Sequence, residues 1–190
     1  MFCHGAIRFP VWKEKEATET LKPSDKTAKN IIEDAIAWYN KGVTFYELGK
    51  LNEAIACYDK AIKNDPKLAF AWNNKGIALL DLDKLEEAIA CFDKAIEIDP
   101  RCASTWFNKG IALYNLGRLN EAIDCFNKVI EIDPRHAGAW FNKGRALYDL
   151  GKLEEAWVYL RTFVKYAPPQ YQQFIDHAKA IINEIEKALG

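Results

Sequence analysis

A unit of 34 residues recurs along most of this chain. Within one copy, Trp106 is followed four residues later by Gly110, and the unit closes at Asp133-Pro134. The same tryptophan returns one period away in each direction, followed after one residue by Asn-Lys-Gly, at Trp38, Trp72, Trp106 and Trp140. A fixed period of this size is typical of stacked repeats, because each unit is too small to bury its apolar face alone. We therefore expect one elongated domain with a continuous core.

Helix-breaking residues divide each unit into two predicted helices, called helix A and helix B. In the first copy, the apolar spacing predicts helix A from near Ala35 to Leu48 and helix B from near Asn52 to Asn64. Gly49 ends the first helix, and Pro66 prevents the second from continuing. The later pairs are expected at 69–82 with 85–98, 103–116 with 119–132, and 137–150 with 153–166.

Small residues recur inside both helices. A glycine in a helix costs about 1 kcal/mol relative to alanine, so its recurrence in helix A needs a reason. We expect close approach of helix B to supply it, with a small alanine opposite each glycine. The pairs are Gly42 with Ala54, Gly76 with Ala88, Gly110 with Ala122, and Gly144 with Ala156. The recurring tryptophans are interpreted as packing between neighbouring repeats in preference to contacting a ligand.

The order of these residues resembles the tetratricopeptide repeat. The marks are Trp, Gly four residues on, an apolar residue three further, a Leu-Gly pair, an Ala, an aromatic residue four later and a closing Pro, and they cover residues 35–170. Two residues depart from the pattern. Asp83 stands where the other repeats have Gly49, Gly117 and Gly151. Leu160 stands where they have the aromatic residues Tyr58, Phe92 and Phe126. Asp tolerates a left-handed turn better than most residues, so we expect the same turn at Asp83.

The resemblance implies an all-α fold, a right-handed α-solenoid of four tetratricopeptide helix-turn-helix repeats with a C-terminal capping helix. The repeats are expected at 35–68, 69–102, 103–136 and 137–170.

The two ends of the chain do not fit the repeat frame. Residues 1–24 are predicted to be an N-terminal non-repeat tail, either mobile or docked on the solenoid through Phe9 to Trp12. Residues 25–34 are expected to extend the first helix, with Ser24 as its N-cap. Residues 171–190 carry an apolar stripe that predicts a capping helix, and pairing of two chains through that stripe is the alternative.

Composition excludes several classes of function. The formal charge is −1, with acids and bases mixed along every repeat, which argues against binding of nucleic acid. No apolar run is long enough to span a membrane, and the start does not resemble a signal peptide, so a cytoplasmic location is expected. The recurring Cys57, Cys91 and Cys125 lie one repeat apart, too far for a disulfide or a shared zinc. No metal or cofactor is expected.

No catalytic motif is found in the sequence. The three histidines are scattered, no cysteine has a histidine at a motif spacing, and neither a phosphate-binding glycine loop nor HExxH is present. We therefore expect that the protein is not an enzyme. The sequence does not exclude a catalytic triad assembled in space from residues that are distant in the chain. A further interpretation is that the chain is a regulatory domain of a larger enzyme.

The resemblance also implies a binding surface. In this family helix A lines the concave face of the superhelix, and ligand contacts come from its second, fifth, sixth, ninth, twelfth and thirteenth positions. The sixth position gives Asn40, Asn74, Asn108 and Asn142. A primary amide can pair with a peptide N–H and C=O together, so the row is similar to the asparagine ladder of the O-linked N-acetylglucosamine transferase. The alternative is that these amides bond within or between repeats.

Apolar and aromatic residues are expected beside that row. The fifth position gives Tyr39, Asn73, Phe107 and Phe141; the ninth gives Val43, Ile77, Ile111 and Arg145; the twelfth gives Tyr46, Leu80, Tyr114 and Tyr148. The thirteenth, with Glu47, Asp81, Asn115 and Asp149, forms an acidic edge. Family members that bind acidic chaperone tails use a clamp of lysine and arginine, for which Arg145 alone offers charge here. An extended peptide with apolar or basic side chains fits better.

The predicted function is a non-catalytic protein–protein interaction scaffold that binds an extended peptide segment in the concave groove. The expected partner is a protein or peptide, with no nucleic acid and no membrane. The alternative is a structural, self-assembling solenoid whose groove or ends are occupied by another copy of itself, as a homo-oligomer joined through the N-terminal tail or the C-terminal helix.

Overall fold

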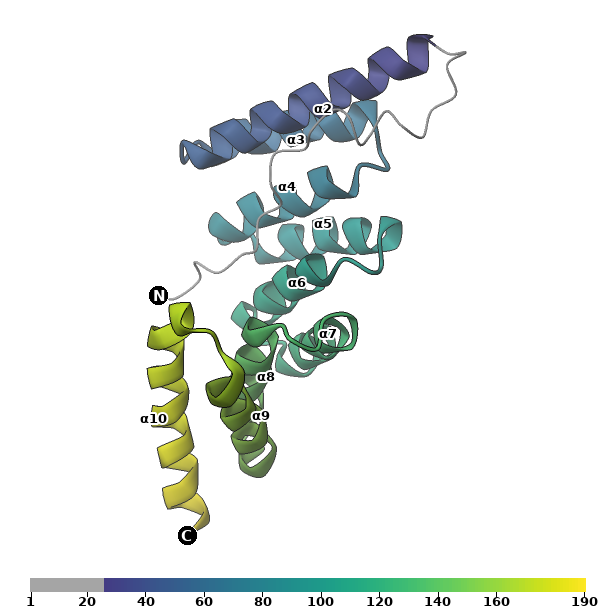
Figure 1. Ribbon diagram of the computed structural model, residues 1–190. Helices are drawn as coiled ribbons and strands as arrows, with labels where there is room; N and C mark the ends of the chain where they lie inside the picture. The colour runs from purple at the N-terminus through teal and green to yellow at the C-terminus, as the bar shows by residue number, and fades with distance from the viewer. Residues whose placement is uncertain (1–25) are drawn as a thin grey trace. The chain divides into compact units, whose positions relative to one another are not determined.

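The computed structural model describes residues 26–190, with side chains from residue 33 onward, and this part of the chain is an all-α solenoid (Figure 1). It contains nine α-helices, one short 3-10 helix and no strand within those residues. In chain order they are α2 (Lys26–Glu47), α3 (Leu51–Asn64), α4 (Ala69–Asp81), α5 (Leu85–Ile98), α6 (Ala103–Asn115), α7 (Leu119–Ile132), α8 (Ala137–Asp149), α9 (Leu153–Tyr166), η1 (Pro169–Tyr171) and α10 (Gln172–Leu189).

The expected helix pairs agree with these bounds. α2, α4, α6 and α8 are the A helices, and α3, α5, α7 and α9 are the B helices. Each later pair differs from its expected bounds by one residue, at the end of the A helix. The segment expected to extend the first helix is helical from Lys26 onward, whereas the N-cap proposed at Ser24 and the docking segment Phe9 to Trp12 lie outside the described residues.

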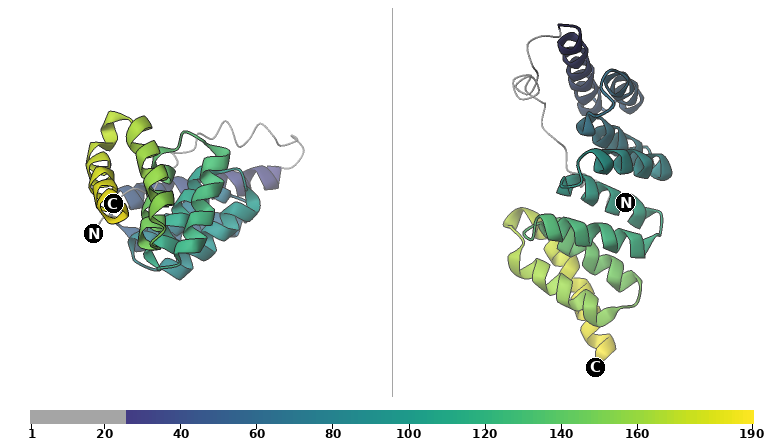
Figure 2. Two further views of the ribbon diagram at one scale, coloured as in Figure 1. Left: turned by 90° about the horizontal axis from the view of Figure 1, so that it is seen from below. Right: turned by 90° about the vertical axis from the view of Figure 1, so that its right-hand side faces the viewer.

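Contacts within the chain form two compact units, Met1–Asn108 and Lys109–Gly190. In the first unit, α2 packs on α3, α3 on α4, and α4 on α5. In the second unit, α7 packs on α8, α8 on α9, and α9 on α10. The two further views in Figure 2 show these consecutive helices lying side by side within each unit. Sequence neighbours are therefore also packing neighbours, as expected for stacked repeats.

Every turn from helix A to helix B is built in the same way. Gly49 has a φ of 73°, its N–H donates to the carbonyl of Tyr46 at 2.9 Å, and the N–H of Lys50 donates to the carbonyl of Phe45 at 2.9 Å. These two bonds form a Schellman motif, which satisfies carbonyls at the helix end. Asp83 has a φ of 60° and the same pair of bonds in its own repeat, so the predicted left-handed turn is confirmed.

The glycines inside the A helices allow the B helices to approach closely. A Cβ added at Gly76 would lie 2.6 Å from Cε1 of the Phe92 ring, and Phe92 is fully buried. The same conflict would arise in the other repeats, for Gly42 with Tyr58, Gly110 with Phe126, and Gly144 with Leu160. The recurring alanines are also fully buried. Helix B approaches each glycine closely, as expected, but the atoms nearest the added Cβ belong to these larger side chains and not to the alanines predicted opposite.

The tryptophans have a structural hydrogen bond in three repeats. The indole N–H of Trp72 donates to the carbonyl of Pro66 at 3.0 Å, six residues earlier in the chain. The equivalent bonds are Trp106 to Pro100 at 2.9 Å and Trp140 to Pro134 at 3.1 Å. Each indole thus ties its A helix to the preceding junction, which agrees with the structural interpretation of these residues.

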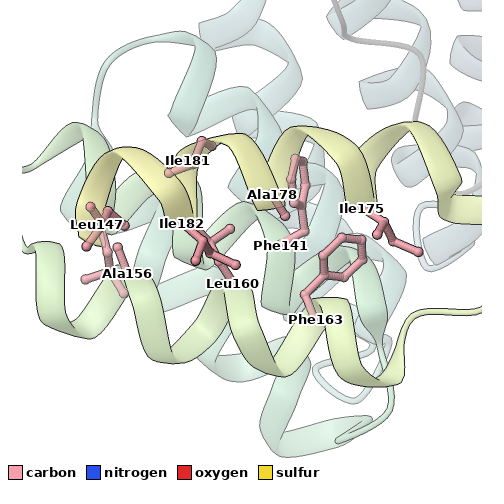
Figure 3. Close-up of a cluster of buried hydrophobic side chains, with 10 residues drawn as sticks. Phe141, Leu147, Ala156, Leu160, Phe163, Ile175, Ala178, Ile181 and Ile182 are labelled. Atoms are coloured by element: carbon pink, nitrogen blue, oxygen red, sulfur yellow. The ribbon is translucent and has the colours of Figure 1, made fainter. Parts of the chain in front are cut away.

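The apolar stripe of α10 packs against the last repeat. Ile175, Ala178, Ile181, Ile182 and Ile185 are buried on one face of α10. Figure 3 shows four of these residues over side chains of α8 and α9 in one cluster, with Phe141, Leu147, Ala156, Leu160 and Phe163. Burial of this stripe is the main apolar contribution of α10 to stability.

Candidate functional site

The residues expected to contact a peptide fall into two groups in the structure. The buried group is Tyr39, Asn73, Asn74, Ile77, Leu80, Phe107, Asn108, Phe141 and Asn142. The half-buried group is Asn40, Tyr46, Ile111, Tyr114, Arg145 and Tyr148. Only the half-buried group offers side-chain surface to a ligand without rearrangement of the helices.

A chain of hydrogen bonds links the buried amides of the first unit. The Nδ2–H of Asn108 donates to Oδ1 of Asn73 at 3.3 Å, and Asn73 donates in the same way to Asn74 at 3.1 Å. Asn74 then donates to the hydroxyl of Tyr39 at 3.0 Å. Asn73 and Asn108 are fully buried. This arrangement is the alternative recognised from the sequence, in which the amides bond between repeats, and their burial leaves a peptide little of them to contact.

The hydroxyl at the end of this chain is strongly shielded from solvent. Burial raises the pKa of Tyr39 to about 12, and the hydrogen bond from Asn74 opposes this shift. The phenol is therefore neutral at physiological pH and available as an acceptor for the amide of Asn74.

The two remaining members of the asparagine row differ from this chain. Asn142 donates through Nδ2 to the carbonyl of Gly138 at 2.8 Å, within its own helix. The Oδ1 atom of Asn40 is buried and has no hydrogen-bond partner among the described residues. The equivalent oxygen of Asn74 accepts from Asn73, whereas the residue that precedes Asn40 is Tyr39, which has no amide side chain.

Tyrosine hydroxyls at the twelfth position of an A helix donate to carboxylates of the next A helix along the chain. The hydroxyl of Tyr46 donates to Asp81, and that of Tyr114 donates to Asp149. The sequence predicted both acids as an edge of the surface but did not predict this pairing. Each bond joins residues 35 apart, so the constant spacing is the signal that could have revealed it.

The last repeat makes the same bond with α10. The hydroxyl of Tyr148 donates to Oε2 of Glu184 at 2.6 Å, across 36 residues. This bond raises the pKa of Tyr148. Glu184 was not among the predicted site residues, because α10 lies outside the repeat frame. For this hydrogen bond, α10 takes the place that an A helix takes elsewhere.

Arg145 completes a polar network on the A helices of the second unit. Its Nη2 donates to the hydroxyl of Tyr114 at 2.9 Å, and its guanidinium lies over the Tyr114 ring at 4.8 Å and the Phe141 ring at 5.7 Å. Burial is the largest cause that raises the pKa of Tyr114 to about 12; the bond to Asp149 also raises it, and Arg145 opposes both. The cation, the phenol and the carboxylate hold one another in place.

Phe141 lies beneath α10. Its ring is 5.1 Å from that of Phe163, 5.4 Å from that of Phe174 and 5.7 Å from that of His177, measured between centroids. Because α10 covers this face of α8, only 2% of Phe141 is exposed. Its ring therefore supports the last repeat and lies below the surface that a ligand could reach.

No metal-binding group and no membrane span is found in the part of the chain that the structure describes. Within it, no three His, Cys, Asp or Glu side chains are grouped so that they could hold an ion. None of its helices combines the length and the apolar character that crossing a bilayer requires.

Comparison with known families gives two matches, both described as the tetratricopeptide repeat. One family model matches residues 35–68, 69–102 and 103–136, and a second matches residues 125–158. The first model matches three of the four repeat frames expected from the sequence.

Several solved structures are similar to this chain. The first domain of Spaghetti (RPAP3), bound to the HSP90 peptide SRMEEVD, is 25% identical, with a TM-score of 0.62 over 63% of this chain and 95% of that chain. The second domain of human RPAP3, in complex with the HSP70 peptide SGPTIEEVD, is 30% identical, with a TM-score of 0.60 over 61% of this chain and 97% of that chain. No curated protein matches the sequence.

MamA covers a larger share of the chain. It is 22% identical, with a TM-score of 0.70 over 82% of this chain and 87% of that chain. At this identity the likeness shows a shared fold.

Proposed function

Because the chain belongs to the tetratricopeptide repeat family, we propose that it is a non-catalytic protein-interaction scaffold that binds an extended peptide segment on its A helices. The family relationship supports a protein or peptide partner, since the similar domains of RPAP3 are bound to short peptides. The half-buried side chains that would make the contact are Asn40 and Tyr46 in the first unit, and Ile111, Tyr114, Arg145 and Tyr148 in the second.

The observation that carries this proposal is the network of Tyr114, Arg145 and Asp149. Tyrosine and arginine are the residue types that most often dominate binding at protein interfaces, because they combine large apolar area with hydrogen bonding. Here both are half-buried and already fixed by mutual contacts. Little side-chain entropy would be lost on binding, which favours affinity.

The exposed carboxylates favour a basic peptide. Asp81 and Asp149 each accept one tyrosine hydroxyl, and a carboxylate has further acceptor sites for a lysine or arginine of the ligand. The neighbouring tyrosine rings would contact apolar side chains. We expect affinity in the micromolar range, roughly −8 kcal/mol.

An acidic chaperone tail does not fit these helices. The family's cationic clamp would require lysine or arginine at positions that here hold Tyr39, Val43, Ser104 and Asn108. Three of these side chains are buried, and Ser104 is small and uncharged. Among the ligand-contact positions of the A helices given above, Arg145 is the only cation, and it already donates to Tyr114.

Selection of random-sequence peptides on the purified full chain tests this proposal. Enriched peptides should combine lysine or arginine with aromatic or aliphatic residues. Changing Asp149→Asn removes the charge and keeps an acceptor for Tyr114, so it should weaken a selected basic peptide about three- to tenfold in a polarisation titration. The control Asp124→Asn makes the same charge change on the exposed face of α7 and should have no effect. Equal loss in both variants, or enrichment of acidic peptides that depend on Asp149, would contradict the proposal.

A further inference from the structure

Helix α9 differs from α5 and α7 at every position after its first four residues. α5 reads LEEAIACFDKAIEI and α7 reads LNEAIDCFNKVIEI, whereas α9 reads LEEAWVYLRTFVKY. Arg161 stands where α5 has Asp93 and α7 has Asn127, and Lys165 stands where both have Glu. Arg161 is therefore basic only in the last repeat, whereas the position of Lys165 is also basic in α3, where it is Lys63.

The same departure removes an ion pair. In α5, Lys94 pairs with Glu97 at 2.8 Å, and in α7, Lys128 pairs with Glu131 at 2.7 Å. The equivalent residues of α9 are Thr162 and Lys165, and the hydroxyl of Thr162 donates to the carbonyl of Val158 at 2.8 Å.

Lys165 therefore cannot form within α9 the lysine–glutamate pair that is seen in α5 and α7. Within residues 33–190, neither it nor Arg161 nor Lys179 of α10 pairs with a carboxylate.

These three cations line one groove between α9 and α10. The groove has a volume of about 630 Å³, within the range of ligand clefts, and Trp157, Tyr166 and Ile182 contribute apolar surface to it. Figure 3 labels Ile182, which points from α10 toward α9. Tyr166 is 69% exposed, although it is a large apolar side chain. The groove thus combines apolar surface with unpaired positive charge.

Contacts inside the groove hold its aromatic and cationic groups in position. The Trp157 indole N–H donates to Oε1 of Glu186 at 2.9 Å, so the one carboxylate that lines the groove is already bonded. The guanidinium of Arg161 lies over the Trp157 ring at 4.6 Å, and the Lys165 ammonium lies 4.9 Å from the Tyr166 ring. A guanidinium stacked on a ring can still donate to a carboxylate through its edge.

We propose that this surface, the α9–α10 groove, binds an acidic peptide segment of another protein that carries an apolar side chain between its carboxylates. Charge complementarity identifies the occupant. Three cations line the groove together with one carboxylate, that of Glu186, so the groove is positively charged although the formal charge of the whole chain is −1. The aromatic rings receive the apolar side chain, and Arg161, Lys165 and Lys179 receive the carboxylates.

This site is separate from the surface proposed for the A helices. It lies on α9 and α10, and it selects the opposite charge. One chain could therefore hold a basic and an acidic segment together, which extends the proposed scaffold function without depending on it.

A fluorescein-labelled hexapeptide, EELFEE with capped ends, tests the α9–α10 groove in a polarisation titration with the full chain. Binding is expected in about 0.05 M salt and should weaken in about 0.3 M salt, because exposed charges are screened. The double variant R161D/K165E gives α9 the residues of α5 at two exposed places, and should weaken binding about tenfold or more. Lys179→Glu, an exposed change on the other helix, should weaken it about threefold.

Matched controls separate this groove from general electrostatics. Changing Lys63→Glu together with Lys67→Glu makes the same kind of charge reversal on exposed residues far along the sequence, and should leave the affinity within about twofold. The proposal is overturned if EELFEE does not bind, if the Lys63 and Lys67 control loses as much as the groove variants, or if an oligothymidylate of equal charge binds more tightly.

Discussion

Replacing Asn73 by alanine should lower the free energy of unfolding by about 2–3 kcal/mol. Asn73 is fully buried between two other amides, accepting from Asn108 at 3.3 Å and donating to Asn74 at 3.1 Å. Alanine removes both bonds and leaves a buried donor and a buried acceptor without these partners. Each such group costs about 1–3 kcal/mol.

The distances and the helix decide where in that range the effect falls. Both bonds are long for N–H···O, so each is assigned the lower half of its range, about 1–2 kcal/mol. Alanine also has a higher helix propensity than asparagine, which returns about 0.6 kcal/mol. The sum stays well above the effect of an ordinary surface change, which is about 0.5 kcal/mol.

Urea unfolding followed by far-ultraviolet circular dichroism measures this difference. Asn52→Ala, on the exposed face of α3, is the control and should stay within about 0.5 kcal/mol of the parent chain. A double-mutant cycle of Asn73→Ala with Asn108→Ala should give a coupling of about 1 kcal/mol, because the two amides share a bond. If Asn73→Ala matches the control, the amides do not support one another, and the asparagine row would be free to bind a ligand.

Three further predictions concern stability. Asp83→Gly should raise the free energy of unfolding by about 0.5 kcal/mol, because glycine adopts a φ of 60° without strain, and a lower melting temperature would refute this. Burial lowers the pKa of His136 below 6.5, so the folded chain binds this proton less readily than the unfolded chain; stability from this group is complete above pH 6.5 and is lost as pH falls through the folded pKa. His136→Asn keeps a capping acceptor and should reduce that loss in melts at about pH 7.5 and 5, which an unchanged pH dependence would contradict. Ile185→Ala should lower the free energy of unfolding in urea by about 2–5 kcal/mol, because Ile185 is fully buried. The control Leu189→Ala changes a half-exposed residue and should lower it far less. Equal losses would contradict the packing of α10.

Most of the fold could be predicted because each recurring residue is required by one particular contact or turn. The glycine at Gly76 exists because the Phe92 ring lies where its Cβ would be, and the left-handed residue at Asp83 marks the end of a helix. Such marks are local, and their period fixes which elements are neighbours. The bounds of the helices follow from them with little further information.

The chemistry of the surface was less accessible from the sequence. Family positions showed that Asn74 and Asn108 lie on helix A, but not which atoms they would meet. Their bonding depends on Asn73, which occupies a position that is aromatic in the other three repeats and so supplies both a donor and an acceptor. One side chain thus decides whether two others face a ligand or each other.

The α9–α10 groove shows a different limit of the repeat pattern. The changes at Arg161 and Lys165 are visible in the sequence as departures from α5 and α7. Their meaning depends on Lys179 and Glu186, which come from a helix with no counterpart in the repeat frame. The period predicts interior contacts well, and it carries no information about the helix that ends the stack.

The bond from Tyr148 to Glu184 has a consequence for the length of the array. If residues 137–170 were duplicated in tandem, the first Tyr148 would find Asp149 of the new copy 35 residues away, the spacing that already joins Tyr114 to Asp149. The second copy of Tyr148 would keep its bond to Glu184. The number of repeats could therefore be increased, by gene duplication or by design, without loss of this hydrogen bond in any copy.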